Sequence, residues 1–453
     1  MGCVASLACC AAETACCLFC RSLCACCGGG SKDTAPNPDA GRVGSLWVML
    51  LAVVLSLVVQ YYAGQLEPRL LDYYAWDDGC DSDACKGAMG VYRVSLCTAL
   101  FFGINAITTW LAPQTHDRAW GGKFAGWLLM LVISAFIPNA LFGPHGYLWV
   151  ARVGGFLFVV IQQVLLIDLA YYVNDWLVAL ADSGEVDDWC GTPSPLVALL
   201  ACSALGFAAA LTGIVLLFVF FGSNCPSPDA IMGLTVTLVV VATVSQLFVS
   251  QDANLLTSSV VAMYMVYLAA SALAANSVTK CNPTHNAGGD WMSVAIGLGF
   301  TLCALAYTIY SASSQVRYLA SGRDAADNGP GGSMTNKIIT GQLPQNGSPD
   351  EPAASYGAGG ERSPESVESG GGGDAPPKTS AEVLSFNVVM ALMAMQVAMV
   401  LTNWGAIEKT GSAASPSSGQ VAMWMQAAAQ WVAGLLYIWT CVAPTLFPDR
   451  EFS

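Results

Sequence analysis

The chain has 453 residues, of which 55% are hydrophobic and only 11% are charged, and its formal net charge is −14. This composition predicts a protein that crosses a membrane several times and excludes a large soluble domain as the main structure. The negative charge argues against nucleic acid as a partner, because nucleic acids are bound through positive charge.

Residues 1–43 form a cysteine-rich segment ahead of the first apolar run. The opening MGCVAS matches the N-myristoylation pattern, with Gly2 as acceptor and Cys3 as an adjacent palmitoylation site. Two lipid groups together would anchor this segment stably. A metal cluster is disfavoured, because no histidine lies nearby and the cysteine spacing is irregular. The remaining interpretation is an amphipathic segment whose cysteines act as small hydrophobes.

Ten apolar runs predict ten membrane-spanning helices, eight within residues 44–312 and two within residues 383–453. The runs lie at 44–63, 91–112, 124–142, 147–172, 196–221, 229–250, 255–277, 293–312, 384–403 and 421–445. A hydrocarbon core needs about 20 helical residues, a length that these runs approach or exceed. The distribution of Lys and Arg favours the cytosol for both termini. We therefore expect an all-α, multi-pass protein of the plasma membrane or an endomembrane.

The run at residues 146–182 is the element around which the other helices are organised. As one helix it would extend about 55 Å, well beyond a hydrocarbon core of about 30 Å, so it must tilt or project. Helical spacing places Arg152 and Gln163 on one face, and Asp168, Tyr172 and Asp175 on a roughly opposite face. Lipid cannot satisfy polar side chains, so each face is expected to meet protein or a water-filled cavity. This predicts a tilted central helix with a bundle on either side.

Four cysteines fall in loops predicted to lie on the outer side of the membrane. The simplest pairing joins Cys80 to Cys85 and Cys225 to Cys281, although the sequence alone leaves other connectivities open. Four further cysteines lie within predicted spans and are interpreted as packing residues, namely Cys97, Cys202, Cys303 and Cys441.

Residues 313–382 differ in composition from the rest of the chain. They are rich in Gly, Pro, Ser and acidic residues and cannot form a hydrophobic core. We interpret them as a disordered cytosolic loop, suited to phosphorylation or to the binding of adaptor proteins.

Several phrases of the sequence resemble the serine incorporator (Serinc) family in content and order. They are AFIP at 135–138, IQQVLLID at 161–168, LLTSSVVAMYMVYLAASAL at 255–273, LTNW at 401–404 and LYIWTCVAPTLFPDREF at 436–452. The likeness extends over nearly the whole chain, but the first loop and the 405–420 loop depart from it. The resemblance implies two bundles separated by a long diagonal helix. It also implies a role with membrane phospholipids, through serine entry into phosphatidylserine and sphingolipid synthesis or through scrambling between leaflets.

The residues themselves favour a lipid conduit over an enzyme, and no cofactor is predicted. We find no Ser-His-Asp constellation, no phosphate-binding glycine loop and no metal-ligand spacing. His116, His145 and His285 lie in predicted loops and are interpreted as solvated surface residues.

A conduit needs polar side chains along which a lipid headgroup crosses the hydrocarbon region. The candidate polar path on the central helix consists of Arg152, Gln162, Gln163 and Asp168, with Arg93 as a candidate ion-pair partner of Asp168. Gln246 and Gln396 lie in other spans, and we interpret them chiefly as interhelical hydrogen-bond partners.

Two alternatives stay open. In the first, the chain is a serine carrier or a scaffold for lipid-synthesising enzymes. A carrier is expected to contain internal inverted repeats, and we see no convincing repeat in this sequence. In the second it is a non-transporting interaction protein that acts through its N-terminal segment and its cytosolic loop.

Overall fold

The computed structural model describes thirteen parts of the chain. They are residues 40–70, 80, 83–112, 115–143, 146–182, 188–189, 192–222, 225–249, 254–278, 280–282, 294–307, 380–405 and 416–446. The predictions for Gly2 and Cys3, and those for residues 313–379, therefore lie outside the described residues. Residues 380–382, which the sequence placed in the cytosolic loop, belong instead to the first turn of a helix.

The described residues are almost entirely helical. The elements are α2 (Ala40–Leu70), α4 (Asp83–Leu111), α5 (Trp120–Ala135), η2 (Asn139–Leu141), α6 (Tyr147–Asp182), α7 (Ser194–Phe221), α8 (Pro226–Phe248), α9 (Leu255–Ala274), α12 (Ser380–Leu401), η4 (Asn403–Gly405) and α13 (Pro416–Leu446). Two short strands, β1 (Asp188–Trp189) and β2 (Thr192–Pro193), pair antiparallel between α6 and α7. Every predicted span coincides with a helix. Among the described residues, eight helices are long and apolar enough to cross a membrane; the other two predicted spans correspond to the shorter apolar helices Trp120–Ala135 and Val294–Tyr307. The predicted all-α polytopic fold is confirmed.

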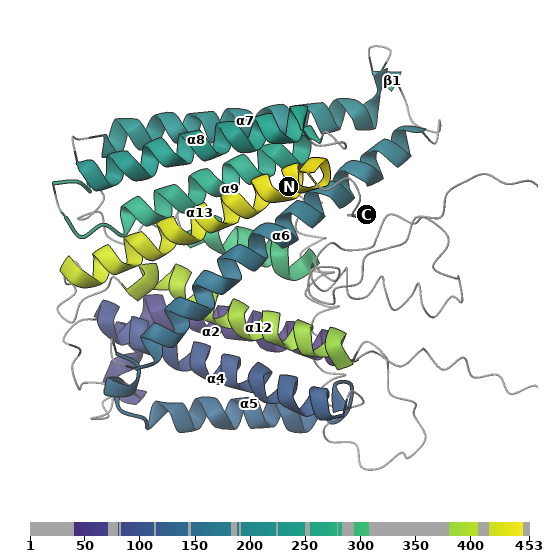
Figure 1. The fold of residues 1–453 in the computed structure, drawn as a ribbon. Helices are drawn as coiled ribbons and strands as arrows, with labels where there is room; N and C mark the ends of the chain where they lie inside the picture. Colours follow the sequence, from purple (N-terminus) through teal and green to yellow (C-terminus); the bar gives the residue numbers. More distant parts are fainter. Residues whose placement is uncertain are drawn as a thin grey trace, which may run out of the picture.

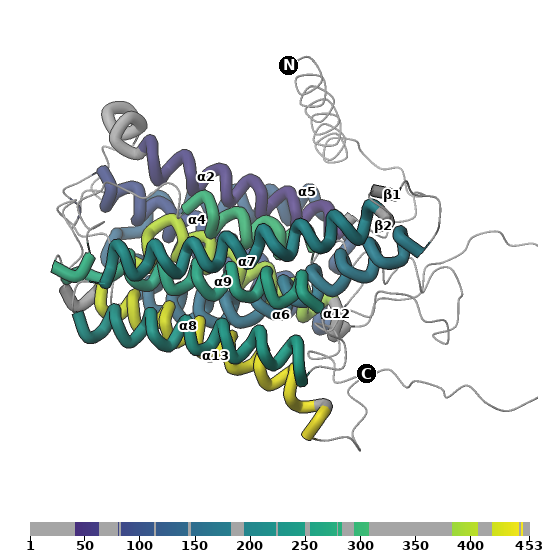
Figure 2. Tube along the Cα trace, turned by 90° about the horizontal axis from the view of Figure 1, so that it is seen from above, coloured from purple at the N-terminus to yellow at the C-terminus, as the bar shows by residue number. Residues whose placement is uncertain are grey.

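The helices form two bundles on either side of α6. In Figure 1, α2, α4, α5 and α12 lie below the diagonal α6, and α7, α8, α9 and α13 lie above it. We call these the first and the second bundle. Figure 2 shows that the helices of both bundles run along a common direction. Each bundle has its own apolar core, which contains Phe102, Trp127 and Met390 in the first, and Ile231 and Leu273 in the second. The predicted arrangement around a central helix is therefore found.

Helix α6 has 36 residues and a length of about 54 Å. Its first two thirds are packed between the bundles, where Ala151, Phe158 and Val159 are fully buried. Asp175, by contrast, is exposed, although the sequence placed it on a stripe expected to meet protein or a cavity. It lies 28 residues beyond Tyr147, or about 42 Å along the helix, which is further than the hydrocarbon core extends.

Small residues allow the helices to approach closely within each bundle and against α6. A Cβ atom added to Gly213 of α7 would lie 2.6 Å from Val266 of α9, and one added to Gly155 of α6 would lie 2.9 Å from Met399 of α12. Interfaces of this kind are expected where van der Waals packing, and not the hydrophobic effect, holds helices together in lipid.

The structure pairs the cysteines as the sequence suggested. Cys80 bonds to Cys85, and Cys225 bonds to Cys281, with Cα–Cα separations of 5.5 and 5.9 Å that are usual for disulfides. The packing interpretation holds for Cys97 and Cys441, which are buried. It is wrong for Cys202 and Cys303, which lie exposed on their helices. We call the end of the molecule where α6 and α13 begin, and where Cys281 follows α9, the disulfide face.

Candidate functional site

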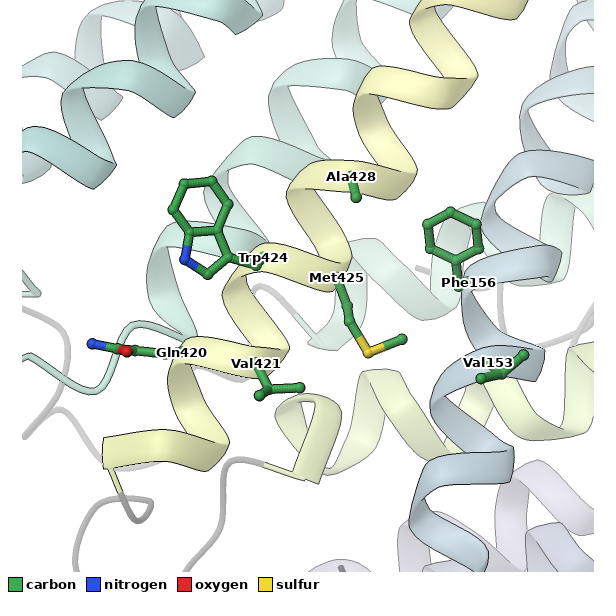
Figure 3. A pocket seen from close by; sticks show the side chains of 7 residues that line it. All are labelled: Val153, Phe156, Gln420, Val421, Trp424, Met425 and Ala428. Carbon is green, nitrogen blue, oxygen red and sulfur yellow. The ribbon is translucent and has the colours of Figure 1, made fainter.

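A groove lies between α6 and α13, where the two bundles meet. Its volume is about 690 Å³, within the range of small-molecule sites in proteins. The residues that line it are Val153 and Phe156 from α6, and Gln420, Val421, Trp424, Met425 and Ala428 from α13 (Figure 3). Val153 and Trp424 are 52% and 42% exposed, so the groove lies at a surface that would face lipid. Among these seven residues only Gln420 is polar, and the lining therefore suits a hydrocarbon chain.

The four predicted path residues are buried, but they do not share one face. Arg152, Gln162 and Gln163 are each 2% exposed and Asp168 is 6% exposed. Gln163 lies seven residues after Phe156, which is close to two helical turns, so it continues the groove side of α6 toward the middle of the molecule. Asp168 is rotated by about 140° from Gln163 and thus faces elsewhere. The structure therefore associates Gln163, but not Asp168, with the groove side of α6.

Gln163 is an unusual residue within this set. Neither its amide nitrogen nor its amide oxygen has a hydrogen-bond partner among the described residues. A buried polar group without a partner costs about 1–3 kcal/mol. The amide oxygen of Gln396 on α12 is also unpartnered within the described part of the chain, and it lies 3.0 Å from the position of a Cβ atom on Gly155. The side-chain amides of Gln163 and Gln396 thus have unused hydrogen-bonding atoms. Both lie in the seam, by which we mean the contact region between α6 and the helices packed against it.

Arg152 binds the turn that follows α12. Its Nε donates a hydrogen bond of 3.0 Å to the carbonyl oxygen of Trp404, and its guanidinium carbon lies 5.3 Å from the centre of the Trp149 ring. The side chain therefore points away from the groove lining, toward η4. Arg152 was predicted to belong to the polar path, and the structure shows in addition that it links the central helix to this turn by a hydrogen bond.

The turn η4 has an unusual backbone. Asn403, Trp404 and Gly405 have φ angles of 45°, 57° and 76°, all in the left-handed region. Non-glycine residues in such a conformation cost on the order of 1–3 kcal/mol each and persist where their surroundings hold them. Trp404 is 2% exposed, and the hydroxyl of Tyr92 on α4 donates to Thr402 at 3.0 Å immediately before the turn.

Arg93 stabilises the end of α5. Its Nε donates to the carbonyl oxygen of Ser134 at 3.1 Å and its Nη2 to that of Ile137 at 2.8 Å, while Phe142 lies against the guanidinium at 4.7 Å. A cation is favourable at this helix end because the last carbonyls carry partial negative charge. Asp168 lies about 30 Å along α6 from its beginning, which follows Phe142 closely. The predicted Arg93–Asp168 ion pair stays a prediction.

The second bundle contains a polar network that links α13 to its neighbours. The amide nitrogen of Gln246 donates to the Tyr171 hydroxyl at 3.0 Å, and its amide oxygen accepts from Tyr437 at 3.2 Å and from the Cys441 thiol at 3.0 Å. Gln430 donates to Thr235 at 2.9 Å. The interhelical role predicted for Gln246 is confirmed. Gln430 was missed, although its position four residues after Gln426 in an apolar span is a recognisable signal.

The interpretation of His116 as a solvated residue is wrong. It is 2% exposed, and its ring lies 5.8 Å from that of Phe386 and 6.4 Å from that of Trp120. Its neighbour Asp117 accepts the backbone N–H of Gly41 at 3.0 Å and so caps the start of α2. His145 and His285 lie outside the described residues. In the described ranges, no three His, Cys, Asp or Glu side chains are grouped as metal ligands would be.

Comparison with known proteins shows similarity over nearly the whole chain. The family model described as serine incorporator (Serinc) matches residues 8–450. A probable serine incorporator of Nematostella vectensis is 28% identical, covering 93% of this chain and 92% of that protein. A probable serine incorporator of Monosiga brevicollis is 25% identical over 81% and 79% of the two chains, and serine incorporator 2 of Bos taurus is 26% identical over 82% and 81%.

Proposed function

Since the chain belongs to the serine incorporator family, we propose that it handles membrane lipids, by guiding phospholipids along the seam between α6 and the second bundle. The groove between α6 and α13 is the observation that carries this proposal. It lies on the lipid-facing surface, its lining accepts a hydrocarbon tail, and its α6 wall continues toward a buried amide. No catalytic step is needed for such a role.

The physical task is to lower the barrier for the headgroup. A charged or strongly polar group in the centre of a bilayer is expensive, because hydrocarbon offers it no hydrogen bonds. Tails can remain in the groove or in the surrounding lipid while the headgroup exchanges hydrogen bonds with side chains. Gln163 provides two donors and an acceptor at about the middle of α6, and Gln162 adds a second amide on an adjoining face.

The described conformation is closed to headgroups. Arg152, Gln162 and Gln163 are each 2% exposed, so a headgroup reaches them only if the seam widens. The proposal therefore requires a second conformation in which α13 moves away from the first half of α6. Asp168, on another face of α6, is assigned no contact with the lipid in this mechanism.

A scrambling assay on purified protein in liposomes tests the proposal. Fluorescent phospholipid on both leaflets is quenched from outside with dithionite, and complete, fast quenching reports exchange between leaflets. We expect wild type to scramble, and both Gln163→Leu and the groove-filling Ala428→Trp to be slower. Leu205→Trp on α7, where Leu205 is 70% exposed, is the matched control. Wild-type protein that behaves like empty liposomes would refute the proposal.

The name of the relatives suggests a second candidate function. That name, serine incorporator, states only that serine is incorporated, and we propose as the alternative that the same seam presents lipid or serine to a synthesising enzyme. Incorporation of labelled serine into phosphatidylserine and sphingolipids, compared in cells with and without the protein, distinguishes this candidate. Ala428→Trp should reduce that incorporation if the groove takes part.

A further inference from the structure

The turn η4 connects the two bundles at the disulfide face. It follows α12 of the first bundle, and it contacts α13 of the second bundle as well as α12. Arg152 of α6 is hydrogen-bonded to it at 3.0 Å. A single three-residue segment therefore touches the first bundle, the second bundle and the central helix at one end of the groove.

The left-handed conformation of this segment has to be held in place. Asn403 and Trp404 have side chains that disfavour it, and only Gly405 adopts it freely. Contacts among the described residues that hold it include the hydrogen bond from Arg152 to the carbonyl of Trp404, the hydrogen bond of 3.1 Å from the Gly405 N–H to the carbonyl of Thr402, and the burial of the indole in a core cluster with Leu148 and Tyr92. Backbone strain of this kind concentrates at sites that switch between conformations.

The turn and the groove are mechanically coupled through α6. A Cβ atom on Gly405 would lie 2.7 Å from Leu148 and 3.2 Å from Nη2 of Arg152, so no side chain fits between the turn and the helix. Val153, the residue next to Arg152, lines the groove. A displacement of Arg152 therefore removes its hydrogen bond to the turn and, at the same time, shifts Val153 in the wall of the groove.

We propose that η4 is a latch that a phosphate-bearing lipid headgroup holds open: when the seam widens, the phosphate binds the guanidinium of Arg152 in place of the carbonyl of Trp404 and so stabilises the open conformation. A phosphate is a stronger acceptor for a guanidinium than a neutral carbonyl, because the hydrogen bonds are charge-assisted and bidentate. Loss of the tie lets the strained turn relax, and the bundles separate at the disulfide face. This inference rests on the proposed function in one respect only, namely that the phosphate belongs to a lipid that occupies the groove.

The test measures the separation of the bundles in two kinds of lipid. Spin labels are placed on α5 at Ile133 and on α7 at Val219, which are 53% and 70% exposed and belong to different bundles. Keto-bearing unnatural residues carry the labels, because the chain has 18 cysteines. The distances between the two labels are measured by double electron–electron resonance in nanodiscs of phosphatidylcholine and in nanodiscs of digalactosyldiacylglycerol, a bilayer lipid that has no phosphate.

We expect one narrow distance in the galactolipid and an additional, longer distance in phosphatidylcholine. Arg152→Met and Gly405→Ala should produce the longer distance in both lipids, whereas Gly233→Ala, with nothing within 4 Å of its added Cβ, should not. Asn403→Gly should act in the opposite direction and reduce the longer population roughly threefold, because glycine removes the strain of the latched state. Opposite effects of this kind would not arise from general destabilisation.

Equal distributions in the two lipids would overturn the inference, as would variants of Arg152 and Gly405 that leave the distances unchanged. The outcome is separable from that of the scrambling assay. Distances that respond to phosphate in a protein that does not scramble would support the latch and refute the proposed function. Scrambling without any change of distance would refute the latch alone.

Discussion

Replacing Gln246 by leucine should weaken the second bundle measurably. Gln246 is completely buried and joins α8 to α6 and α13 through Tyr171, Tyr437 and Cys441. Interhelical hydrogen bonds in a membrane contribute about 0.6 kcal/mol each on average. Three such contacts give about 2 kcal/mol, and the hydroxyl of Tyr437, left in an apolar core, adds a desolvation penalty that offsets the gain from the extra apolar surface of leucine. We expect a net loss of about 2 kcal/mol.

Reversible unfolding in mixed micelles, followed by helix content, measures this loss. Gln420→Leu is the matched control, because Gln420 is exposed at the groove and no contact of its side chain enters the network; its effect should stay within about 0.5 kcal/mol. A double-mutant cycle with Tyr437→Phe should give a coupling energy of about 0.5 kcal/mol or more. A Gln246→Leu variant as stable as wild type would refute the reasoning that this network holds the helices together.

Three further predictions concern packing, capping and covalent links. Gly213→Leu should prevent the close approach of α7 to α9 and lower the yield of folded protein on size exclusion, whereas Gly233→Ala should not, since nothing lies near it. Asp117→Ala should cost about 1 kcal/mol of stability through loss of the cap on α2, seen as faster amide exchange at the start of that helix and contradicted by unchanged exchange. Mass spectrometry of a non-reduced digest should recover Cys225 linked to Cys281, and a digest with both as free thiols would contradict the structure.

The sequence predicts the architecture well because lipid imposes simple rules. Apolar runs of about 20 residues are expected to be helices, because a helix satisfies its own backbone hydrogen bonds in lipid. Each of the ten runs coincides with a helix in the described part of the chain, and eight of these helices are long enough to cross a membrane. The run at 146–182 is too long for one perpendicular crossing, which is enough to predict an inclined helix. The prediction is wrong at Asp175, because a helical wheel assigns faces and does not say where along the helix the protein ends.

The candidate site is less accessible from sequence because it depends on the partners of each side chain. Arg152 and Arg93 both lie in apolar helices that are long enough to cross a membrane, yet one binds the carbonyl of a turn and the other binds carbonyls at and beyond the end of α5. Their acceptors are backbone carbonyl oxygens, which every residue has, so the sequence does not indicate which of them an arginine binds. The groove forms between residues that are about 270 positions apart in the chain, such as Val153 and Met425. No local sequence pattern predicts it.

His116 shows that the burial of a loop residue is also difficult to predict from the sequence. A lone histidine in a short loop is usually solvated, and only the packing of that loop against the start of α2 and against Phe386 of α12 buries it. Such a contact joins segments separated by some 270 residues and follows from the way in which the helices of the first bundle assemble.

The length of α6 has a consequence for control of the molecule from outside the bilayer. The helix is continuous from Tyr147 to Asp182, so the groove wall near its beginning and the exposed end around Trp176 belong to one stiff rod. The groove wall at Val153 and Phe156 lies within the part packed between the bundles, and the last third of the helix, around Trp176, extends beyond that part as an exposed end. We therefore expect a protein or antibody fragment that binds this exposed end to change the inclination of α6, and with it the shape of the groove, from outside the membrane.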